Sequence, residues 1–559
     1  MLVRLAAGAA AVLLGSACGP SGGPAPGAPT APASKPAAAP SPAAGAPRKG
    51  GVLRASTLGG APKVLHPYPE AQHNTVPRSD AAALIYASLI DIDYEALDWV
   101  ADPRRSLARE MPKVSNGGRT FTFSLRDDAR WSDGQPITAA DFQFAWDNAS
   151  KKENNFVGLA DLERIESFKT PDARTIEVTL KEALARFPAL VIANTIIPIP
   201  KHVWDGKPWL DPGGNPEIVK PSVVSGPFVV KEISAERHAY ARNPSWWGQP
   251  PNLDEIVFVN ASPQTVLELL KTRQVEWAQN VPPAQYEDAK KQPNINVVDW
   301  IGATGSYRVV IFNLKRPLLA DRRVREALVR AINRDDLIQF EDNLAVPQYG
   351  LYTEGSKWKN EAVERYAFDL NRSKQLLEQA GYRLEGGVLK GADGQPVKLD
   401  ILWPTTSQPR GKMATYLQQQ WKQLGIEATV TGIEFNAFTD KYQRQRDFDV
   451  AMGSFSAGLD PDGVKSQIIT DGQQNATGYS NPRVDELVRL GVAEQDEARR
   501  KQLYDELQKV VVDDLPQYYM LSTKNVTAFD KRVGGVVPLT GGDILRQNNL
   551  QVLEWYVQP

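Results

Sequence analysis

The sequence predicts a mixed α/β protein with more than one lobe, because strand and helix patterns alternate along most of the chain. Three observations support this: strictly alternating strands, amphipathic helices with recognisable caps, and no repeat of fixed period. The chain has 559 residues, of which 42% are hydrophobic and 23% are charged. That composition is ordinary for a globular protein, and the length allows two or more domains. A formal net charge of -2 excludes the overall basic field of nucleic-acid binders.

The first 18 residues, MLVRLAAGAAAVLLGSAC, form a unit of their own. A positive charge at Arg4 precedes an apolar run of about ten residues. That run is too short to span a bilayer, which needs roughly 20 residues. Small residues follow at positions 15–17, as a signal peptidase requires. The segment is therefore predicted to be an export signal.

Cys18, the only cysteine of the chain, stands where the cleavage site ends. This resembles a bacterial lipobox, in which the cysteine is lipidated and becomes the mature N-terminus, although Gly15 stands where that pattern usually has Leu. The alternative is a plain signal peptide cut near Ala17, with Cys18 incidental. An exposed free thiol is a liability in an oxidising compartment, which favours lipid attachment at Cys18.

Residues 19–49 consist almost entirely of Ala, Pro, Gly and Ser, and they show no apolar periodicity. Such a segment cannot form a core and is predicted to be a disordered, extended tether. Pro-rich chains extend by about 3.1 Å per residue, so this tether would reach up to roughly 90 Å. The body from about Gly50 onward is expected to be soluble and to lie outside the cytoplasm.

The elements of the body follow from local patterns. Alternating apolar residues predict half-buried strands at 119–126, 174–180 and 254–260. Between the first two, Thr138 is an N-cap and Asp141 completes a variant of the capping box, which predicts a helix there. Further amphipathic helices are predicted at 321–338, at 369–381 ending in Gly381, and at 481–491 ending in Gly491.

A search for catalytic or metal-binding patterns yields little. A single cysteine excludes an internal disulfide and a Cys-rich metal site, and the four histidines show no ligand spacing. No phosphate-binding loop or nucleophile elbow is present. Acidic pairs such as Asp460 with Asp462 are typical of solvated turns. The sequence therefore predicts a protein that is not an enzyme and that needs no metal or cofactor.

The 13 tryptophans allow two interpretations. Trp146 and Trp421 lie on predicted amphipathic helices and are expected in the core. Others lie near turns or strand ends: Trp131, Trp246, Trp247 and Trp403. The second group either packs under loops or lines a cleft that offers apolar rings with a few polar groups.

Five segments, in order from about residue 105 to 490, together resemble one family. They are LAREMPKVSNGGRTFTFSLRDDARWSDGQPITAADFQFAWD, VVSGPFVV with YARNPSWWG, IFNLKRPLLADRRVREALVRAINRDDLI, FDVAMGSFSAGLDPDG and GYSNPRVDELV. The resemblance is to the extracellular solute-binding proteins of ABC transporters, family 5, the oligopeptide, dipeptide and nickel group. It implies a two-lobe hinged fold of the periplasmic-binding-protein type (type II, cluster C), with ligand buried between the lobes and delivered to a membrane permease.

The resemblance also implies a small extra domain inserted in the first lobe. We expect lobe 1 to comprise residues 50–91, 186–300 and 527–559, the inserted domain 92–185, and lobe 2 residues 301–526. In open α/β sheets the binding crevice lies at the carboxyl ends of strands. On that ground the candidate ligand-binding residues are Tyr307, Asn313, Trp403, Phe455 and Ser456.

One departure from the family concerns the ligand. Peptide-binding relatives often carry an aspartate for the α-amine three residues before the acidic-Pro pair, and this chain has Ala457 there. An unpaired buried ammonium is costly, so a peptide with a free amine needs another carboxylate. The leading hypothesis is a monomeric, lipid-anchored peptide receptor of an ABC importer. The alternatives are an oligosaccharide receptor of the same family, a glycoside hydrolase with paired acids in a Trp-lined cleft, and a non-transport sensor or adhesion lipoprotein.

Overall fold

The computed structural model describes most of the chain after the tether. The described residues are 48–57, 60–70, 76–93, 96–278, 281–456, 458–536 and 551–559. The predicted export signal with Cys18, nearly all of the predicted tether, and Ala457 lie outside these residues. Residues 44–559 form one compact unit, which holds every described residue. Among the described residues, no helix combines the length and the apolar character needed to cross a membrane.

A seven-stranded sheet forms the centre of lobe 1, with the strand order β12-β21-β11-β1-β10-β9-β8. The strands are β1 (Val52–Thr57), β8 (Phe228–Ile233), β9 (Arg237–Arg242), β10 (Glu255–Asn260), β11 (Trp277–Ala278), β12 (Ile295–Trp300) and β21 (Asn525–Asp530). Helix α1 (Val76–Ile85) contacts β8, while α6 (Val266–Lys271) contacts β11 and α7 (Tyr286–Lys291) contacts β12. Two separate apolar clusters pack on this sheet, as its alternating strands require.

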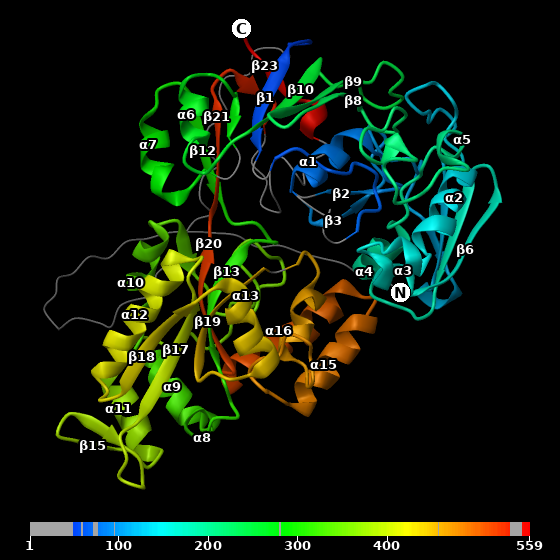
Figure 1. Ribbon diagram of the computed structural model, residues 1–559. Helices are drawn as coiled ribbons and strands as arrows, with labels where there is room; N and C mark the ends of the chain where they lie inside the picture. Colours follow the sequence, from blue (N-terminus) through cyan, green and yellow to red (C-terminus); the bar gives the residue numbers. More distant parts are fainter. Residues whose placement is uncertain are drawn as a thin grey trace, which may run out of the picture. The chain divides into compact units, whose positions relative to one another are not determined.

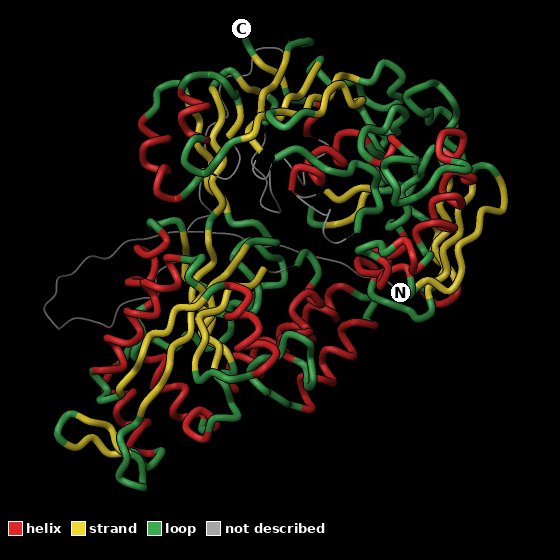
Figure 2. Tube along the Cα trace, viewed as in Figure 1, coloured by secondary structure: helices red, strands yellow, loops and turns green. Residues whose placement is uncertain are grey.

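A six-stranded sheet forms lobe 2, with the order β14-β20-β13-β19-β17-β18. The strands are β13 (Ser306–Phe312), β14 (Ala345–Pro347), β17 (Lys398–Pro404), β18 (Glu427–Ile433), β19 (Val450–Ser456) and β20 (Gln517–Thr523). The helices of this lobe are α8 (Pro317–Ala320), α9 (Arg322–Arg330), α10 (Arg334–Ile338), α11 (Leu370–Gln379), α12 (Gln408–Lys422), α13 (Phe435–Thr439), α14 (Lys465–Ile468), α15 (Pro482–Ala493) and α16 (Glu497–Asp514). Figure 2 shows these helices flanking the strands. A short hairpin, β15 (Arg383–Glu385) with β16 (Val388–Lys390), extends from the lobe.

A four-stranded antiparallel sheet marks the small domain, with the order β4-β5-β7-β6. The strands are β4 (Lys113–Ser115), β5 (Thr120–Ser124), β6 (Ile165–Asp172) and β7 (Thr175–Leu180). Around them lie α2 (Ala139–Ala149), α3 (Leu159–Leu162), α4 (Arg186–Ala193), α5 (Lys201–Trp204) and the hairpin β2 (Asp91–Asp93) with β3 (Asp98–Val100). The apolar cluster of this domain also draws on residues between Val64 and Ile90 and between Leu184 and Trp246. Its core therefore extends beyond residues 92–185.

The chain passes twice between the two large sheets. It leaves β12 at Trp300 and enters β13 at Ser306, and it returns through Lys524 from β20 to β21. The two passages are neighbours, because β12 pairs with β21 and β13 pairs with β20, both antiparallel. The Lys524 ammonium lies 2.7 Å from the Asp299 carboxylate and ties them together. In Figure 1, β20 and β21 follow one another as orange-red strands. The prediction of more than one lobe is confirmed.

Most local predictions are confirmed as well. The inward residues of β5 and β7 are buried, and both halves of the capping box at Thr138 and Asp141 are present. The helix predicted at 321–338 is instead two helices, α9 and α10, because Asn333 adopts an extended conformation and caps the second. The predicted end at Gly491 is also wrong, since α15 continues to Ala493. A Cβ at Gly491 would lie 2.6 Å from the Tyr504 ring, so this glycine serves close packing of α16.

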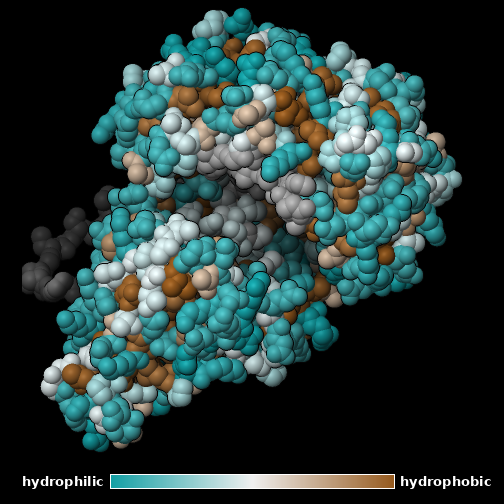
Figure 3. All heavy atoms as spheres, viewed as in Figure 1, coloured by the Kyte–Doolittle hydropathy of each residue, from teal (hydrophilic) through white to brown (hydrophobic). Residues whose placement is uncertain are grey.

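Exposed apolar side chains occur singly or in small groups on the face shown in Figure 3. Among all described residues, on whichever face they lie, the large exposed apolar side chains are Val52, Val114, Val157, Val191, Phe368, Leu384, Val388 and Phe435. Because they are scattered over all three sheets and their loops, they need no docking partner to explain them.

Candidate functional site

The predicted site residues fall at the two ends of the lobe 2 sheet. Ser306 pairs with Ser456, so the carboxyl end of β19 lies beside the passage from lobe 1. Strand β17 runs parallel to β19, which brings Trp403 to the same end. Asn313 lies at the opposite end, because β13 is antiparallel to β19 and finishes next to Val450. The structure therefore brings Tyr307, Phe455 and Ser456 together and places Trp403 toward the same end of the sheet, while Asn313 lies at the other end.

Tyr307 has no exposed surface and packs within the lobe 2 core. Its ring centroid lies 6.1 Å from that of Phe455 and 6.0 Å from that of Tyr519. The hydroxyl donates to Gln467 Oε1 at 3.3 Å, and burial raises the tyrosine pKa. These contacts give Tyr307 a packing role beneath the site.

Asn313 closes the turn after β13. Its side-chain amide donates to the carbonyl oxygens of Arg446 at 3.0 Å and Phe448 at 2.8 Å, and its Oδ1 accepts from the Lys315 backbone N–H at 3.1 Å. Both functions of the amide group are thus used within the protein.

Trp403, Phe455 and Ser456 keep some exposure at the end nearest the passages. The Trp403 indole is held between two glycines, since a Cβ at Gly411 or Gly432 would lie 2.7 or 2.8 Å from its ring. Ser456 is exposed, and its hydroxyl lies 3.3 Å from that of Ser306. All 13 tryptophans lie in the described residues, and none of them is exposed.

Two arginines at this end of the sheet were not among the predicted site residues. Arg410, in the first turn of α12, is only 9% exposed, and its Nε has no hydrogen-bond partner within the described residues. Its Nη1 donates to the Met452 carbonyl at 3.4 Å. Burial, together with the neighbouring Arg308, lowers the pKa of Arg410 to about 10. Arg308 itself is paired, donating to Glu341 at 2.7 Å and to the Ser454 hydroxyl at 2.7 Å.

A signal for Arg410 is present in the sequence. Arg410, Ala414, Leu417 and Trp421 recur at helical spacing on α12, and all four are buried. A positive charge in an apolar stripe is unusual, because a buried charge is costly unless it is paired. The helical spacing of Arg410 with the apolar residues of α12 therefore indicates, from the sequence alone, that this arginine is buried rather than solvated.

The turn after β19 carries two acidic side chains, Asp460 and Asp462, which contact Arg500 of α16. Asp460 caps a short 3₁₀ helix, and Arg500 of α16 donates to both of its carboxylate oxygens at 2.6 and 2.8 Å. Asp462 lies 3.3 Å from the same guanidinium. The two acidic side chains are only 14% and 12% exposed, so the prediction of a solvated acidic pair is wrong. Burial and the nearby Asp460 raise the pKa of Asp462 to about 6.

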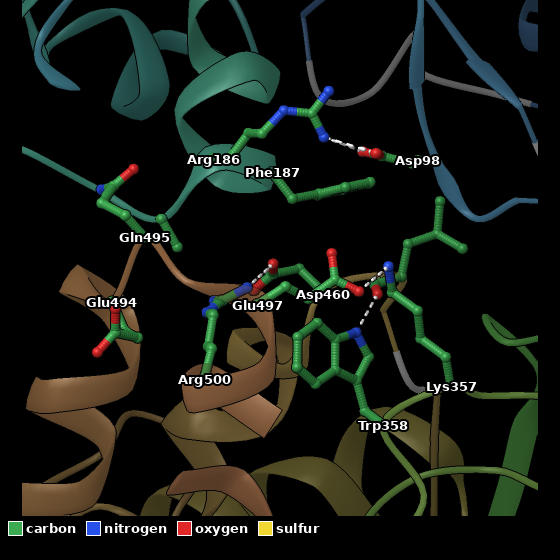
Figure 4. Close-up of a pocket in the computed structure, with 12 residues that line it drawn as sticks. Asp98, Arg186, Phe187, Lys357, Trp358, Asp460, Glu494, Gln495, Glu497 and Arg500 are labelled. Atoms are coloured by element: carbon green, nitrogen blue, oxygen red, sulfur yellow. Dashed lines mark hydrogen bonds and ion pairs between the residues drawn. The ribbon is translucent and has the colours of Figure 1, made fainter. Parts of the chain in front are cut away.

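A small pocket lies at the seam between the small domain and lobe 2 (Figure 4). Arg186 and Phe187 of the small domain lie on one side, and Trp358, Asp460 and Arg500 of lobe 2 on the other. Six of the seven charged side chains around it form salt bridges: Arg186 with Asp98, Arg500 with Asp460, and Lys357 with Glu497. The seventh, Glu494, accepts a hydrogen bond from the Asp496 backbone N–H. Within the described chain, no cluster of His, Cys, Asp and Glu side chains is arranged to hold a metal ion.

Comparison with known proteins places this geometry in a family. Residues 102–476 match the family described as bacterial extracellular solute-binding proteins, family 5. The periplasmic oligopeptide-binding protein OppA of Salmonella typhimurium is 26% identical over 517 residues, covering 86% of this chain and 89% of OppA. Protein XP55 of Streptomyces lividans is 28% identical over 436 residues, covering 76% of this chain and 77% of XP55.

Among solved structures, the fold resembles that of the ABC transporter substrate-binding protein CtaP from Listeria monocytogenes. The TM-score is 0.76 at 23% identity, and the likeness covers 92% of this chain and all of the other. The predicted two-lobe fold is confirmed by this likeness. Since the family match spans well over half of the chain, the protein belongs to the bacterial extracellular solute-binding proteins of family 5.

Proposed function

We propose that this protein captures peptides between its lobes and delivers them to the permease of an ABC importer. Family membership supports a binding protein rather than an enzyme. The name of the relative OppA supports an oligopeptide ligand. The observation that carries the proposal is the buried Arg410 guanidinium, whose Nε lacks a partner beside Arg308 within the described residues.

Arg410 fits one end of a peptide. Arg410 and Arg308 share one neighbouring carboxylate, that of Glu341, which bonds only to Arg308 among the described residues. An anionic group of a ligand would offset the cost of burying the second guanidinium. A terminal carboxylate suits this site because a guanidinium bonds carboxylates with two parallel N–H groups.

The alternatives find less support. An oligosaccharide receptor or a Trp-lined hydrolase needs free indole faces, and the tryptophans are used in packing. Asp460 and Asp462 share one arginine and therefore lack the independence of a general acid and base. A receptor, unlike a hydrolase, would release its ligand chemically unchanged.

Ligand anchoring is tested with matched peptides that end in a carboxylate or in an amide. We expect amidation to weaken binding roughly 10- to 100-fold, as loss of a charge-assisted hydrogen bond does. In Arg410→Gln the two peptides should bind alike, while Lys374→Gln, a change at an exposed residue of α11, should retain the difference. Equal binding of both peptides to the unchanged protein would contradict the proposed role of Arg410.

Thermal shift against peptides and oligosaccharides separates the ligand classes, because a bound ligand stabilises by mass action. Recovery of cleaved ligand from the same mixture would overturn the receptor proposal. N-acetylated peptides test the amine end. If Ala457 leaves the amine without a carboxylate, then acetylation should cost little affinity.

Attachment to the membrane is proposed through a lipid on Cys18, with the tether giving reach. Mass spectrometry of the mature N-terminus should show an acylated cysteine. Cys18→Ser should move the protein from the membrane fraction to the soluble fraction. An unmodified mature protein that is released would leave only the plain signal-peptide interpretation.

A further inference from the structure

Arg500 joins two segments of lobe 2 that are far apart in sequence. Its Nη1 and Nη2 donate to the Asp460 carboxylate, and its Nε donates to the Gly491 carbonyl at 2.8 Å. The side chain is 3% exposed and lies between the rings of Trp358 and Tyr504, at 5.3 and 5.4 Å. Although burial lowers the pKa of Arg500, its hydrogen bond to Asp460 raises it above the ordinary value.

The first segment, residues 458–462, is a turn that comes after β19, the strand that carries the candidate residues Phe455 and Ser456. Tyr352 donates to the Pro461 carbonyl at 2.9 Å, and Trp358 donates to the Leu459 carbonyl at 3.0 Å. The Asp460 side chain accepts from the Asp462 backbone N–H at 3.0 Å. Three hydrogen bonds thus hold the backbone of this turn, and the Asp460 carboxylate connects the turn to Arg500.

The second segment, residues 491–495, ends α15 and contacts the small domain. The Val492 carbonyl accepts from the Ala185 backbone N–H at 2.8 Å, and the Gln495 side-chain amide donates to the Leu184 carbonyl. The Val492 side chain packs against both the lobe 2 cluster and the small-domain cluster. This segment is thus a direct link between lobe 2 and the small domain.

We propose that Arg500 is a positioning residue that couples the turn after β19 to this seam with the small domain. Its planar guanidinium holds both partners in one fixed geometry, so the Asp460 turn and the Gly491 carbonyl move together. That the coupling serves ligand capture rests on the proposed function. Binding at the end of β19 then stabilises the seam, and closure at the seam strengthens binding by the same factor.

The test measures hydrogen–deuterium exchange with single-residue resolution in the ligand-free protein. The Ala185 amide reports the seam, and the Ala189 amide, bonded to the Ala185 carbonyl within α4, is the internal control. Asp460→Asn keeps a capping side chain but weakens the charged pair, and Arg500→Lys cannot reach both segments. We expect Ala185 to exchange at least about tenfold faster in both variants, with Ala189 unchanged.

Arg483→Lys is the matched control, because Arg483 pairs with Glu506 on the outer side of α15 and α16. It should leave Ala185 exchange unchanged. A merely structural role for Arg500 predicts faster exchange in β19 and α16 with Ala185 unaffected, and that result would overturn the proposal.

Gln495→Ala adds a second readout. Alone it should accelerate exchange at Ala185, and in the Asp460→Asn background it should add little, because the seam is already loosened. If the rate increases at Ala185 in the two single variants multiply in the double variant, the proposed coupling would also be overturned. Since no ligand is used, failure of peptide binding would leave these outcomes intact and would count against the proposed function alone.

Discussion

Among the described residues, lobe 2 contains three buried arginines. Arg325 is satisfied by four backbone carbonyls, whereas Arg500 and Arg410 differ in the number of carboxylates beside them. Arg500 lies against Asp460 and Asp462, whereas Arg410 has Arg308 as its neighbour and forms no salt bridge within the described residues. Burial penalises both guanidiniums, and only the first is compensated inside the protein. The difference teaches that one residue type serves as an internal connector at one place and as a group available to an anionic ligand at another.

Replacing Arg500 should cause the largest change in the free energy of unfolding. Arg500→Met leaves two buried carboxylates without their cation, and we expect a loss of about 3–5 kcal/mol in the free energy of unfolding. Urea unfolding at pH 7 measures it. A loss below about 1 kcal/mol would mean that the two arginines do not differ as described.

The next largest change in the free energy of unfolding should come from protonation of the Asp462 carboxylate. Its folded pKa of about 6 exceeds the ordinary 3.8, so the fold favours the protonated carboxyl. The resulting stabilisation is full below about pH 4 and is lost as pH rises through 6. The charged groups that act on it are Asp460, Arg500, Lys465 and Arg164.

Relative to Asp462→Asn, the unchanged protein should gain about 1–3 kcal/mol between pH 7 and pH 4. Urea unfolding of both proteins at several pH values checks this. A difference that stays constant with pH would contradict the raised pKa of this carboxyl.

Removing Arg410 should change stability little. Arg410→Met removes a buried charge that has no salt bridge within the described residues, and we expect a change within about 1 kcal/mol, of either sign. Chemical unfolding without ligand gives the value. A loss as large as that of Arg500→Met would show that Arg410 already has a partner in the free protein.

The smallest change in the free energy of unfolding is expected for the exposed arginine Arg483, which forms salt bridges on the surface of α15 and α16. Arg483→Gln breaks the contacts of Arg483 with Glu486 and Glu506, all of which are solvent-exposed. Such pairs contribute little, so the unfolding midpoint should not shift beyond experimental error. A clear shift would mean that burial is not what separates these arginines.

The fold was largely predictable, because strand alternation and helix caps are local properties of the sequence. β5 and β7 follow their apolar residues, and α15 begins at Asn481 and Pro482 as predicted. Gly491 failed as a helix end because its role depends on the Tyr504 ring, which is distant in sequence.

The site was harder to predict, since strand direction is a tertiary property. Asn313 follows β13 and Trp403 lies near the carboxyl end of β17, yet the two are at opposite ends of the sheet because β13 runs against β19 and β17. Arg410 could have been found from its place in an apolar stripe. Its neighbour Arg308 could not, because only the pairing of β13 with β19 brings it beside Ser454.

The position of β21 has a consequence for synthesis of the chain. This strand lies between β11 and β12 in the lobe 1 sheet, although more than 200 residues of lobe 2 separate it from β12 in sequence. Lobe 2 can therefore fold as soon as β20 has emerged, whereas the lobe 1 sheet remains in two pieces until residue 530 has been made. A chain that ends prematurely after β20 would carry a finished second lobe beside an open sheet edge, the kind of surface that invites aggregation and quality control.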